Sequence, residues 1–528
     1  MSMQRIHSLG RGSAEKLFRR RRGAGLFWLG LTLLCGVLGF LAAAMTAGAV
    51  ARLGAFPVVL GGLLLLWAMP KRNESPDALL NGLLLVLLTS IHLWPEYIFS
   101  RLGGLPAISP TKIAWLAFLS ISLFFVLSCR QPMARLFSRC AAHRTFVGSV
   151  AFLMLWRIVT SLAGPEPLFQ LWQLGSELLT FYLLFFLALA ILRDERDVFR
   201  LLAVLVVVAA AQVLLASYEA FVQHTLFEKF ISVGQQDPGT LQSILMDKFR
   251  GGHYRAQGTF THPMVLAEFM AMMMPLAVAV FLGSKSLALR SIAAGLVPVA
   301  FVMIVSSRSR AGIAVVLISL LLLGLLAMIP RNRGTARNAS SSGLLIAALV
   351  LPVLVAVTYF AGSELLTLVV GRNTSEANST MTRMLMLQQG IPLLFDSPVL
   401  GYGNAMGAVK LGFFDGVRYN IDSYFLSTAL DAGVPGITAF VMVFAGSALL
   451  GFRGYMRRND LAGTASGLIA VSIMMLIGVK SVLSIPSGFS LAYVLIASLV
   501  VLREAPPAGA LASDRHTLRT RLRAGVPG

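Results

Sequence analysis

The chain has 528 residues, enough for several soluble domains, but its composition excludes a soluble fold. Hydrophobic residues make up 57% and charged residues only 13%, about half of the roughly 25% that is typical of soluble domains. The 44 Lys and Arg residues outnumber the 23 Asp and Glu residues, which gives a net charge of +21. Such a charge can indicate a nucleic-acid partner, but apolar runs of membrane-spanning length recur along the whole chain. We therefore predict an all-α polytopic membrane protein without a nucleic-acid partner.

The apolar runs predict fourteen membrane-spanning helices, or as few as twelve if the short second run and the third do not cross. They lie at about 27–50, 54–69, 78–98, 112–129, 146–164, 170–192, 199–222, 263–283, 288–306, 310–329, 343–362, 423–452, 461–482 and 485–502. The first run follows four consecutive arginines and is too long for a signal-peptide core, which indicates an uncleaved anchor.

The loop charges predict the orientation of these helices. If the N-terminus is cytoplasmic, 29 of the 44 Lys and Arg residues fall on the cytoplasmic side, 14 fall outside, and Arg157 lies within a span. This bias agrees with the positive-inside rule. The C-terminus is then cytoplasmic as well.

The same map predicts the organisation of the chain, including two long extracytoplasmic loops. Its segments are a basic N-terminus at 1–24, helices at 25–222, a loop at 223–262, helices at 263–362, a large loop at 363–422, helices at 423–502 and a disordered tail at 503–528. Long loops are usually functional or disordered. Because both contain aromatic and aliphatic residues, we expect short amphipathic helices at the interface.

Arginines stand out on the extracytoplasmic side because it is otherwise poor in charge. Arg255 lies near the end of the first long loop, Arg308 and Arg310 lie between two spans, and Arg383 lies in the second loop. Guanidinium groups bind phosphate oxygens in pairs and keep their charge, so arginines from three segments suit a diphosphate. The alternative is that each arginine reaches to lipid headgroups or pairs with a carboxylate.

Other polar residues carry weaker predictions. We expect Arg157 and Glu177, which lie within spans, to form a structural pair, with a functional role as the alternative. Glu268 lies one turn inside its span and could line the same cavity as the arginines. The sequence contains no cluster typical of a zinc site and no Gly-rich phosphate loop, so we predict neither a metal nor another cofactor.

At these residues the chain resembles the O-antigen ligase and O-antigen/exopolysaccharide polymerase family of bacterial inner membranes. The resemblance covers roughly residues 200–450. It is carried by Arg255-Ala-Gln-Gly258-Thr-Phe-Thr-His-Pro263, by Ser307-Arg308-Ser309-Arg310, by Arg383 with Pro398-Val-Leu-Gly401-Tyr-Gly403, and by Asp422-Ser423, which nine residues separate from Gly433-Val-Pro-Gly436. The family has a histidine where this chain has Asp422, which favours the polymerase branch over the ligase branch.

The resemblance implies glycosyl transfer on the periplasmic face of the bacterial inner membrane. The donor would be a glycan on undecaprenyl diphosphate and the acceptor another lipid-linked repeat, with a chain-length regulator and a flippase of the same pathway as partners. Arg255, Arg310 and Arg383, with Arg308 in reserve, would hold the diphosphate without a metal. Asp422 is the candidate base, and its alternative role is to cap the helix that follows. The candidate sugar platforms are Tyr402 and Tyr424.

Other functions fit the same composition. A ligase that transfers the glycan to another acceptor such as lipid A core differs only in the acceptor. A lipid-linked oligosaccharide flippase or another transporter also has many spans, but it should carry polar residues through the membrane and lack large outer loops. A scaffold subunit is the third alternative.

Overall fold

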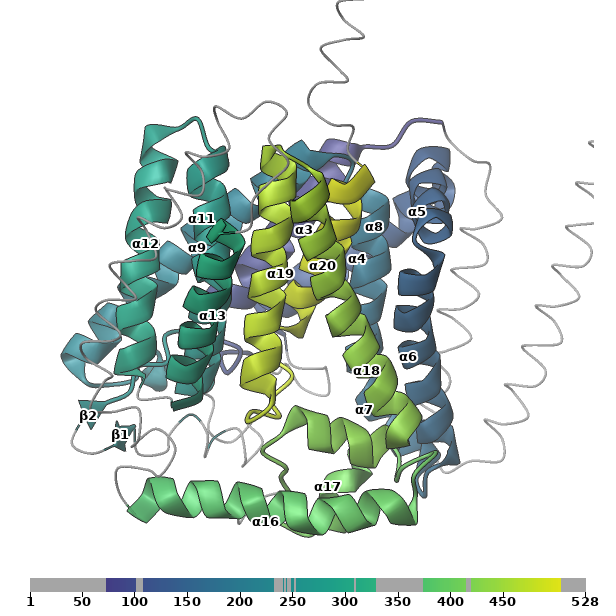
Figure 1. Ribbon diagram of the computed structural model, residues 1–528, viewed down its shortest axis with the longest axis vertical. Coiled ribbons are helices and arrows are strands. Elements are labelled where there is room, and N and C mark those ends of the chain that lie inside the picture. Colours follow the sequence, from purple (N-terminus) through teal and green to yellow (C-terminus); the bar gives the residue numbers. More distant parts are fainter. Residues whose placement is uncertain are drawn as a thin grey trace, which may run out of the picture. The chain divides into compact units, whose positions relative to one another are not determined.

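The computed structural model describes most of the chain between residues 73 and 504 (Figure 1). The described residues are 73–100, 108–231, 241, 244, 248–250, 253–307, 310–328, 374–414 and 419–504. Contacts divide the chain into two units. The larger unit comprises Ser75–Ser122 and Gln131–Gly528, and it contains all the residues of the candidate site. The smaller comprises Met1–Glu74 and Leu123–Arg130, and within it the Cys129 thiol donates to the Glu74 carbonyl (3.1 Å).

Helices account for nearly all of the regular structure in the described residues. They are α3 (Asp77–Leu93), α4 (Pro110–Ser128), α5 (Arg130–Ala142), α6 (Arg144–Ala163), α7 (Pro167–Glu177), the π-helix η1 (Leu178–Leu183), α8 (Leu184–Ile191), α9 (Glu195–Val222), the 3-10 helix η2 (Glu228–Phe230), α11 (Pro263–Gly283), α12 (Leu287–Ser306), α13 (Arg310–Met328), α16 (Thr374–Asp396), α17 (Met406–Leu411), α18 (Tyr424–Arg457), α19 (Leu461–Lys480) and α20 (Phe489–Glu504). The antiparallel strands β1 (Phe249–Arg250) and β2 (His253–Tyr254) form a short hairpin.

The predicted class, an all-α polytopic membrane protein, is confirmed. Eight helical segments of the described chain are long and apolar enough to cross a membrane: α4, α6, α7 to α8 as one segment, α9, α11, α12, α18 and α19. A helix satisfies all its backbone hydrogen bonds internally, as a span in lipid must. Helices α3, α13 and α20 coincide with further predicted spans. The predicted spans at 27–50, 54–69 and 343–362 lie outside the described residues.

Two differences from the prediction have a clear physical cause. Helix α3 ends at Leu93 rather than at residue 98, because Pro95 disfavours helical geometry at the residue before it, and Trp94 is extended (φ −90°, ψ 127°). The segment 130–142, which was predicted to be a loop, forms α5. The buried Arg139 side chain holds this helix by donating to main-chain carbonyls that follow α8 and to Glu504.

Helices α11 and α19 form the centre of the larger unit. They pack against each other, and their spans are 89% and 83% buried, whereas α12 is 28% buried. Helices α9, α12 and α13 flank α11, while α13, α18 and α20 flank α19. The central helices are therefore shielded from lipid by their neighbours, and charged residues on them must find partners within the protein.

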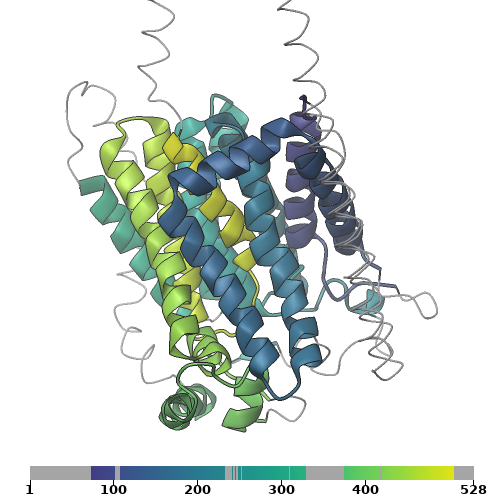
Figure 2. The ribbon, with the colours of Figure 1, turned by 90° about the vertical axis from the view of Figure 1, so that its right-hand side faces the viewer.

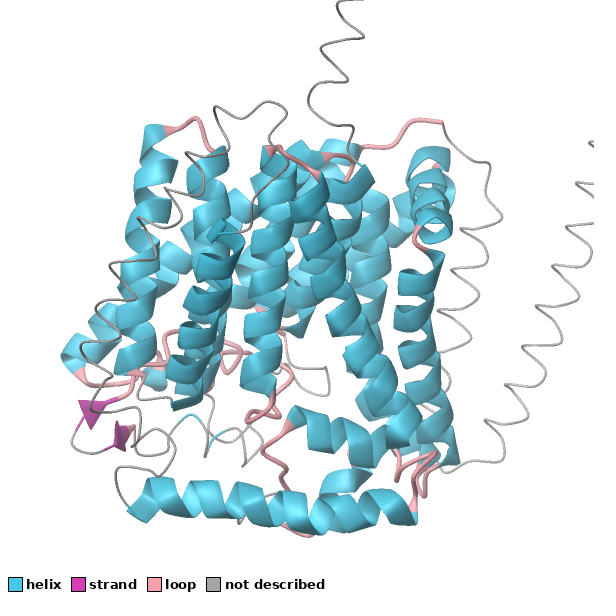
Figure 3. Cartoon of the chain, viewed as in Figure 1, coloured by secondary structure: helices cyan, strands magenta, loops and turns pink. Residues whose placement is uncertain are grey.

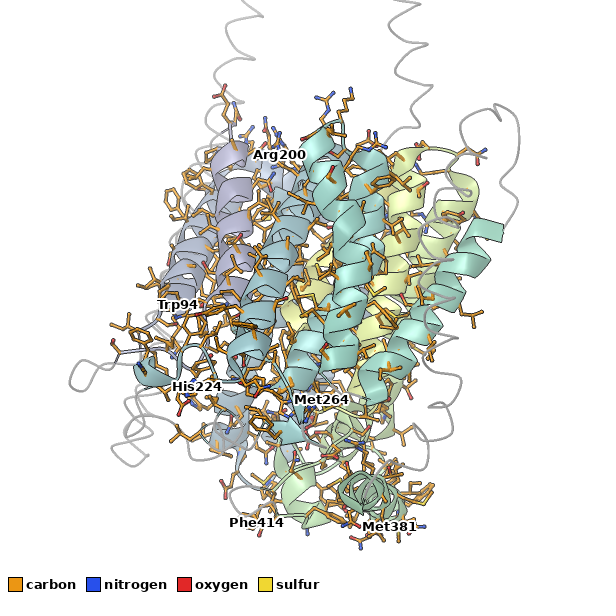
Figure 4. All side chains as sticks on the ribbon, turned by 90° about the vertical axis from the view of Figure 1, so that its left-hand side faces the viewer. Trp94, Arg200, His224, Met264, Met381 and Phe414 are labelled. Atoms are coloured by element: carbon orange, nitrogen blue, oxygen red, sulfur yellow. The ribbon has the colours of Figure 1, made fainter. Side chains whose placement is uncertain are left out.

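Both long loops lie at one end of the bundle, which we call the loop end. Helix α16 lies across this end at a large angle to the spans, with α17 beside it, and β1 and β2 lie at the same end (Figures 1 and 2). Pink loop segments also gather there (Figure 3). Trp94, His224, Met264, Phe414 and Met381 lie towards this end, and Arg200 lies at the opposite end (Figure 4).

The second loop contains the helix α16 where a short amphipathic helix was expected, but α16 has 23 residues, and it exposes Met381, Met384 and Phe395 while it buries Met386. A small apolar cluster joins it to α17 and to the start of α18. The cluster comprises Met386, Leu411, Ile421, Leu426 and Leu430. The second loop is therefore a packed layer over the end of the bundle.

Candidate active site

The segment that carries Arg255 is anchored on Glu219, a fully buried residue in the last turn of α9. One carboxylate oxygen accepts from the backbone N–H groups of Gln257 (3.1 Å) and Gly258 (2.5 Å). The other accepts from the Tyr254 hydroxyl (2.9 Å). Gly258 has φ +61°, and a Cβ there would lie 2.7 Å from the Gln212 side-chain oxygen. The glycine of the Arg-x-x-Gly-Thr-Phe motif is therefore required by the backbone.

Arg255 lies against the corner between α12 and α13. Its Nε donates to the main-chain carbonyl of Ser307, the residue that ends α12 (2.7 Å). Arg310 is the first residue of α13, and its side chain lies outside the described residues, as does all of Arg308. The structure thus brings two of the three predicted arginine-bearing segments together.

Lys248 is a buried cation that sequence reasoning did not single out. Its carbonyl accepts from the Arg255 backbone N–H (2.9 Å), and its side chain is 8% exposed. The pKa of Lys248 is lowered to about 8, mainly by burial. The Glu219 carboxylate opposes this shift, and the positive charge of Arg255 adds to it. A charge at Lys248 is therefore costly, and the nearby Glu219 carboxylate offsets part of this cost. In the sequence, the position of Lys248 seven residues before Arg255 could have indicated that this lysine belongs to the same cationic segment.

Arg383 and Asp422, which were predicted as separate site residues, contact each other directly. Arg383, on α16, donates through Nε to Asp422 Oδ2 (3.0 Å), and the two side chains are 30% and 26% exposed. Asp422 does not cap α18. The cap is Ser423, whose hydroxyl accepts from the Leu426 N–H (3.4 Å). The capping role that was the alternative for Asp422 is therefore filled by Ser423.

The Pro-x-x-Gly-x-Gly and Gly-x-x-Gly segments of the resemblance pack against each other. Gly433 breaks α18 with φ 67° and ψ −172°, which leaves carbonyls of the preceding turn available. Tyr402 N–H donates to Leu430 O (2.8 Å) and Gly403 N–H to Asp431 O (3.0 Å), while Val434 N–H donates to Pro398 O (2.7 Å). A Cβ on Gly433 would lie 2.3 Å from the Val399 carbonyl oxygen. These glycines therefore build the junction between the second loop and α18.

The predicted Arg157–Glu177 pair is present; Arg157 is buried, and Glu177 is partly exposed. Arg157 also donates to the Asn404 side-chain oxygen, directly after the Gly-Tyr-Gly turn, and to the Tyr424 hydroxyl (3.5 Å). The pair thus ties α6 and α7 to both ends of the junction. This arrangement satisfies a charge that would otherwise be costly inside a span.

The two tyrosines predicted as sugar platforms have protein partners. The Tyr402 hydroxyl donates to Leu393 O (2.9 Å), and Lys410 lies 5.5 Å from the centre of its ring. Tyr424 is 8% exposed and packs against Phe440 and Phe489. Their contacts fit packing of the second loop and of α18, and we leave both out of the proposed site.

A cavity of about 340 Å³ lies in the larger unit, beside the Arg255 segment. It is lined by residues of α3, α4, α7, η1, α11 and α20, of the segment that precedes α11, and of the loop that joins α19 to α20. Three glutamates line it: Glu96, Glu177 and Glu268. Glu268 was predicted to share a cavity with the site arginines; it lines this cavity, but neither Arg255 nor Arg383 does. Glu96 was not predicted as a site residue because the third span was predicted to continue through it. A single glutamate directly after Trp94-Pro95, where a proline can end a helix, could have indicated it.

Glu268 is paired within the membrane-spanning bundle. Lys480, at the end of α19, lies 2.7 Å from Glu268 Oε2 and also donates to the Ile485 carbonyl (2.6 Å). Ser487 donates to the other Glu268 oxygen (3.1 Å). Both charged side chains are almost completely buried, at 1% and 0% exposed. The pair closes one side of the cavity.

The described residues contain no group of three or more His, Cys, Asp or Glu side chains that could hold a metal ion. The cations that could bind an anion are arginines and one lysine. What the arrangement can do chemically is to bind an anion through guanidinium groups at the loop end, next to a cavity lined by carboxylates.

Residues 294–441 match the family model described as Wzy_C, O-antigen ligase. The matched segment begins in α12 and ends in α18, so it includes Arg310, α16 with Arg383, and Asp422. No curated protein matches the chain. Over these residues the predicted resemblance to the O-antigen ligase family is confirmed, in a chain that is a membrane protein.

Proposed function

We propose that the chain is a glycosyltransferase that uses a lipid-linked oligosaccharide as its donor. The donor would be a glycan on undecaprenyl diphosphate, and the reaction would take place on the periplasmic face of a bacterial inner membrane. The match to the O-antigen ligase model supports transfer of a lipid-linked glycan in general. Both chain termini would be cytoplasmic, as the charge bias predicts.

The observation that carries the proposal is the hydrogen bond from the Arg255 side chain to the main-chain carbonyl of Ser307. It joins the hairpin segment to the corner where α13 begins with Arg310 (2.7 Å). Cationic segments that are distant in the sequence thus converge at one end of the bundle, where α16 adds Arg383. A lipid diphosphate presents its negative charge at the membrane surface, and guanidinium groups bind phosphate oxygens in a bidentate manner.

The chemistry needs no nucleotide because the diphosphate is already a leaving group. An acceptor hydroxyl attacks the sugar carbon that is bonded to the diphosphate, that bond breaks, and the lipid diphosphate leaves with the electron pair. Fixed arginines stabilise the charge that develops on the leaving oxygen. Holding donor and acceptor side by side supplies much of the remaining acceleration. We propose that the reaction is metal-independent for this reason.

We favour polymerisation, in which a second lipid-linked repeat is the acceptor. Asp422 stands where the family has a histidine, and its carboxylate is held by Arg383. The second candidate is ligation to a different acceptor such as lipid A core, which the description of the matching family favours. A chain-length regulator and a flippase of the same pathway are the proposed partners of a polymerase.

The test is to purify the protein and add lipid-linked oligosaccharides extracted from the source organism. Elongation with these alone supports a polymerase. Transfer only after a second acceptor is added supports a ligase. Complete absence of transfer with both, in a protein that moves the lipid-linked glycan across vesicles, would overturn the proposal in favour of a flippase.

Variants link the activity to the arginines. Arg255→Lys, Arg310→Lys and Arg383→Lys each keep the charge but lose the planar fork, so we expect at least about a tenfold loss of product. The matched control is Arg457→Lys at the far end of α18, where the side chain is exposed. Full activity of all three variants would reduce these arginines to surface anchors.

A further inference from the structure

The cavity beside the Arg255 segment has the size and lining of a site for a polar organic ligand. Its volume of about 340 Å³ lies within the roughly 300–1,000 Å³ range of small-ligand pockets. Trp115 supplies an aromatic face, and hydroxyl side chains of Thr111, Ser176, Thr180 and Ser490 also line it. Hydroxyl-bearing sugars combine an apolar ring face with many hydrogen-bonding groups, and this lining can contact both.

The three glutamates of the cavity argue against two other classes of ligand. An acyl chain gains nothing from carboxylates, whose burial is costly. A metal ion would need its ligands gathered at one point, and the described residues contain no such group. Carboxylates that are spread around a cavity instead accept hydrogen bonds from hydroxyl groups at several positions.

The three carboxylates differ in their partners. Glu177 is paired with Arg157, and Glu268 is paired with Lys480. Within the part of the chain that the structure describes, no hydrogen bond or ion pair holds the carboxylate of Glu96, which lines the cavity from the turn after α3. Glu96 is therefore the carboxylate that can accept a proton without first losing a cationic partner.

The chain segment that carries Arg255 continues directly into residues that line the cavity. Phe260 and Thr261 line it, and they follow Arg255 by five and six residues. The anchoring of Gln257 and Gly258 on Glu219 fixes the backbone between the two places. Arg255 and the wall of the cavity are thus held in a fixed relation by one short, anchored backbone segment.

We propose that the cavity binds a sugar of the acceptor glycan and that Glu96 takes the proton of the attacking hydroxyl. The inference rests on the proposed function and deepens it. The hydroxyl oxygen bonds to the donor sugar carbon, the carbon–oxygen bond to the diphosphate breaks, and the electron pair leaves with the lipid diphosphate. The hydroxyl proton passes to the Glu96 carboxylate and then to water. Asp422, held by Arg383, positions that arginine rather than acting as the base.

The experiment measures elongation of lipid-linked oligosaccharides extracted from the source organism, by the purified full-length protein. Glu96→Gln keeps the shape and the hydrogen-bonding capacity of the side chain but cannot take the proton, so we expect kcat to fall by roughly 100-fold or more. We expect the acceptor KM to stay within about twofold and Glu96→Asp to recover part of the activity. The matched control is Glu166→Gln, an exposed glutamate before α7, which should match the unmodified chain.

A second measurement addresses the sugar site itself. Lipid-free oligosaccharide released from the same extract should compete with the acceptor in the unmodified chain. Trp115→Ala should weaken that competition at least about fivefold, whereas the donor KM changes little, because the diphosphate is held elsewhere.

The outcomes separate the two proposals. If the unmodified chain elongates the substrate and Glu96→Gln does so at the same rate, Glu96 is not the base and the inference fails while the proposed function stands. If Glu96→Gln and Glu96→Asp are equally inactive and both raise the acceptor KM, the glutamate has a structural role and the inference also fails. If the unmodified chain shows no transfer to any acceptor, the proposed function itself fails.

Discussion

Arg383 and Asp422 illustrate how an ion pair at a partly exposed position can matter for geometry more than for stability. Their side chains are 30% and 26% exposed, and a pair of this kind contributes at most about 1 kcal/mol to the free energy of unfolding. A guanidinium group that is held at Nε keeps a fixed direction, and phosphate binding depends on direction.

The first prediction therefore concerns Asp422→Asn. The amide oxygen can still accept from Arg383 but carries no charge, so we expect product formation to fall about three- to tenfold and the unfolding temperature to change little. Elongation and thermal unfolding in detergent measure the two effects. Asp422→Asn combined with Arg383→Lys should lose little more than Arg383→Lys alone. If the fold loss of activity in the double variant equalled the product of the two single losses, the two residues would act independently.

The second prediction concerns the pH dependence that Glu96 imposes. The side chain is exposed to the cavity, but protein atoms surround it at short range, and the resulting desolvation raises the pKa of Glu96 above its ordinary value. A base must be ionised, so activity should fall as the pH decreases through this raised pKa, at a higher pH than an ordinary glutamate would give. The other charged or titratable groups that face the cavity are His92, Glu177 and Glu268, with Lys480 behind Glu268.

Rate measurements across the pH range check this prediction. The acidic limb should be absent in Glu96→Gln, which has no carboxylate at this position. The Glu166→Gln control should keep the limb unchanged. An acidic limb that persists in Glu96→Gln would assign the titration to another group.

Helix α18 depends on one break, and the third prediction concerns Gly433. Its backbone geometry is essentially restricted to glycine, and a Cβ would meet the Val399 carbonyl oxygen at 2.3 Å. We expect Gly433→Ala to lower the free energy of unfolding by at least about 2 kcal/mol. Gly148→Ala on α6 is the matched control, because no atom lies within 4 Å of its Cβ position and alanine favours a helix. Equal unfolding temperatures for the two variants would contradict the assigned role of the junction.

The fourth prediction concerns the pair between α11 and α19. Removing one partner leaves a buried charge alone, so Lys480→Met should destabilise the protein by about 3–5 kcal/mol. Glu268→Gln together with Lys480→Met removes both charges and should recover much of that loss. Thermal unfolding in detergent measures both variants. If the double variant were less stable than Lys480→Met, the contribution of the pair would not be electrostatic.

The sequence predicted the spans well because apolar periodicity and length are physical requirements of the bilayer. It predicted the Arg157–Glu177 pair for the same reason, since a charge inside a span needs a partner. It did not predict that Asp422 contacts Arg383, because their 39-residue separation contains a turn and α17, whose path depends on packing. Glu96 was missed because hydropathy averages over a window and does not show where Pro95 ends a helix.

The arrangement of the two long loops at one end of the bundle gives the fifth prediction. The charge bias places that end outside the cytoplasm, and the two loops share it in the structure (Figure 1). We replace the native cysteines by serine and introduce Gln388→Cys on α16 or Lys285→Cys between α11 and α12, both at exposed positions. A membrane-impermeant thiol reagent added to intact spheroplasts should label the cysteine at 388 and leave that at 285 unlabelled. Labelling in the reverse pattern would overturn the orientation and the location of the site.

The buried pair of Glu268 and Lys480 also has a consequence for biogenesis. The two residues are 212 positions apart, so α11 is synthesised and inserted long before its cationic partner leaves the ribosome. Until α19 arrives, the nascent chain carries a carboxyl group in the membrane without its final partner. We expect a chain that terminates after α18 to keep this unpartnered carboxyl group and to be degraded more readily than the full-length chain. Formation of the pair thus requires that α19 be synthesised.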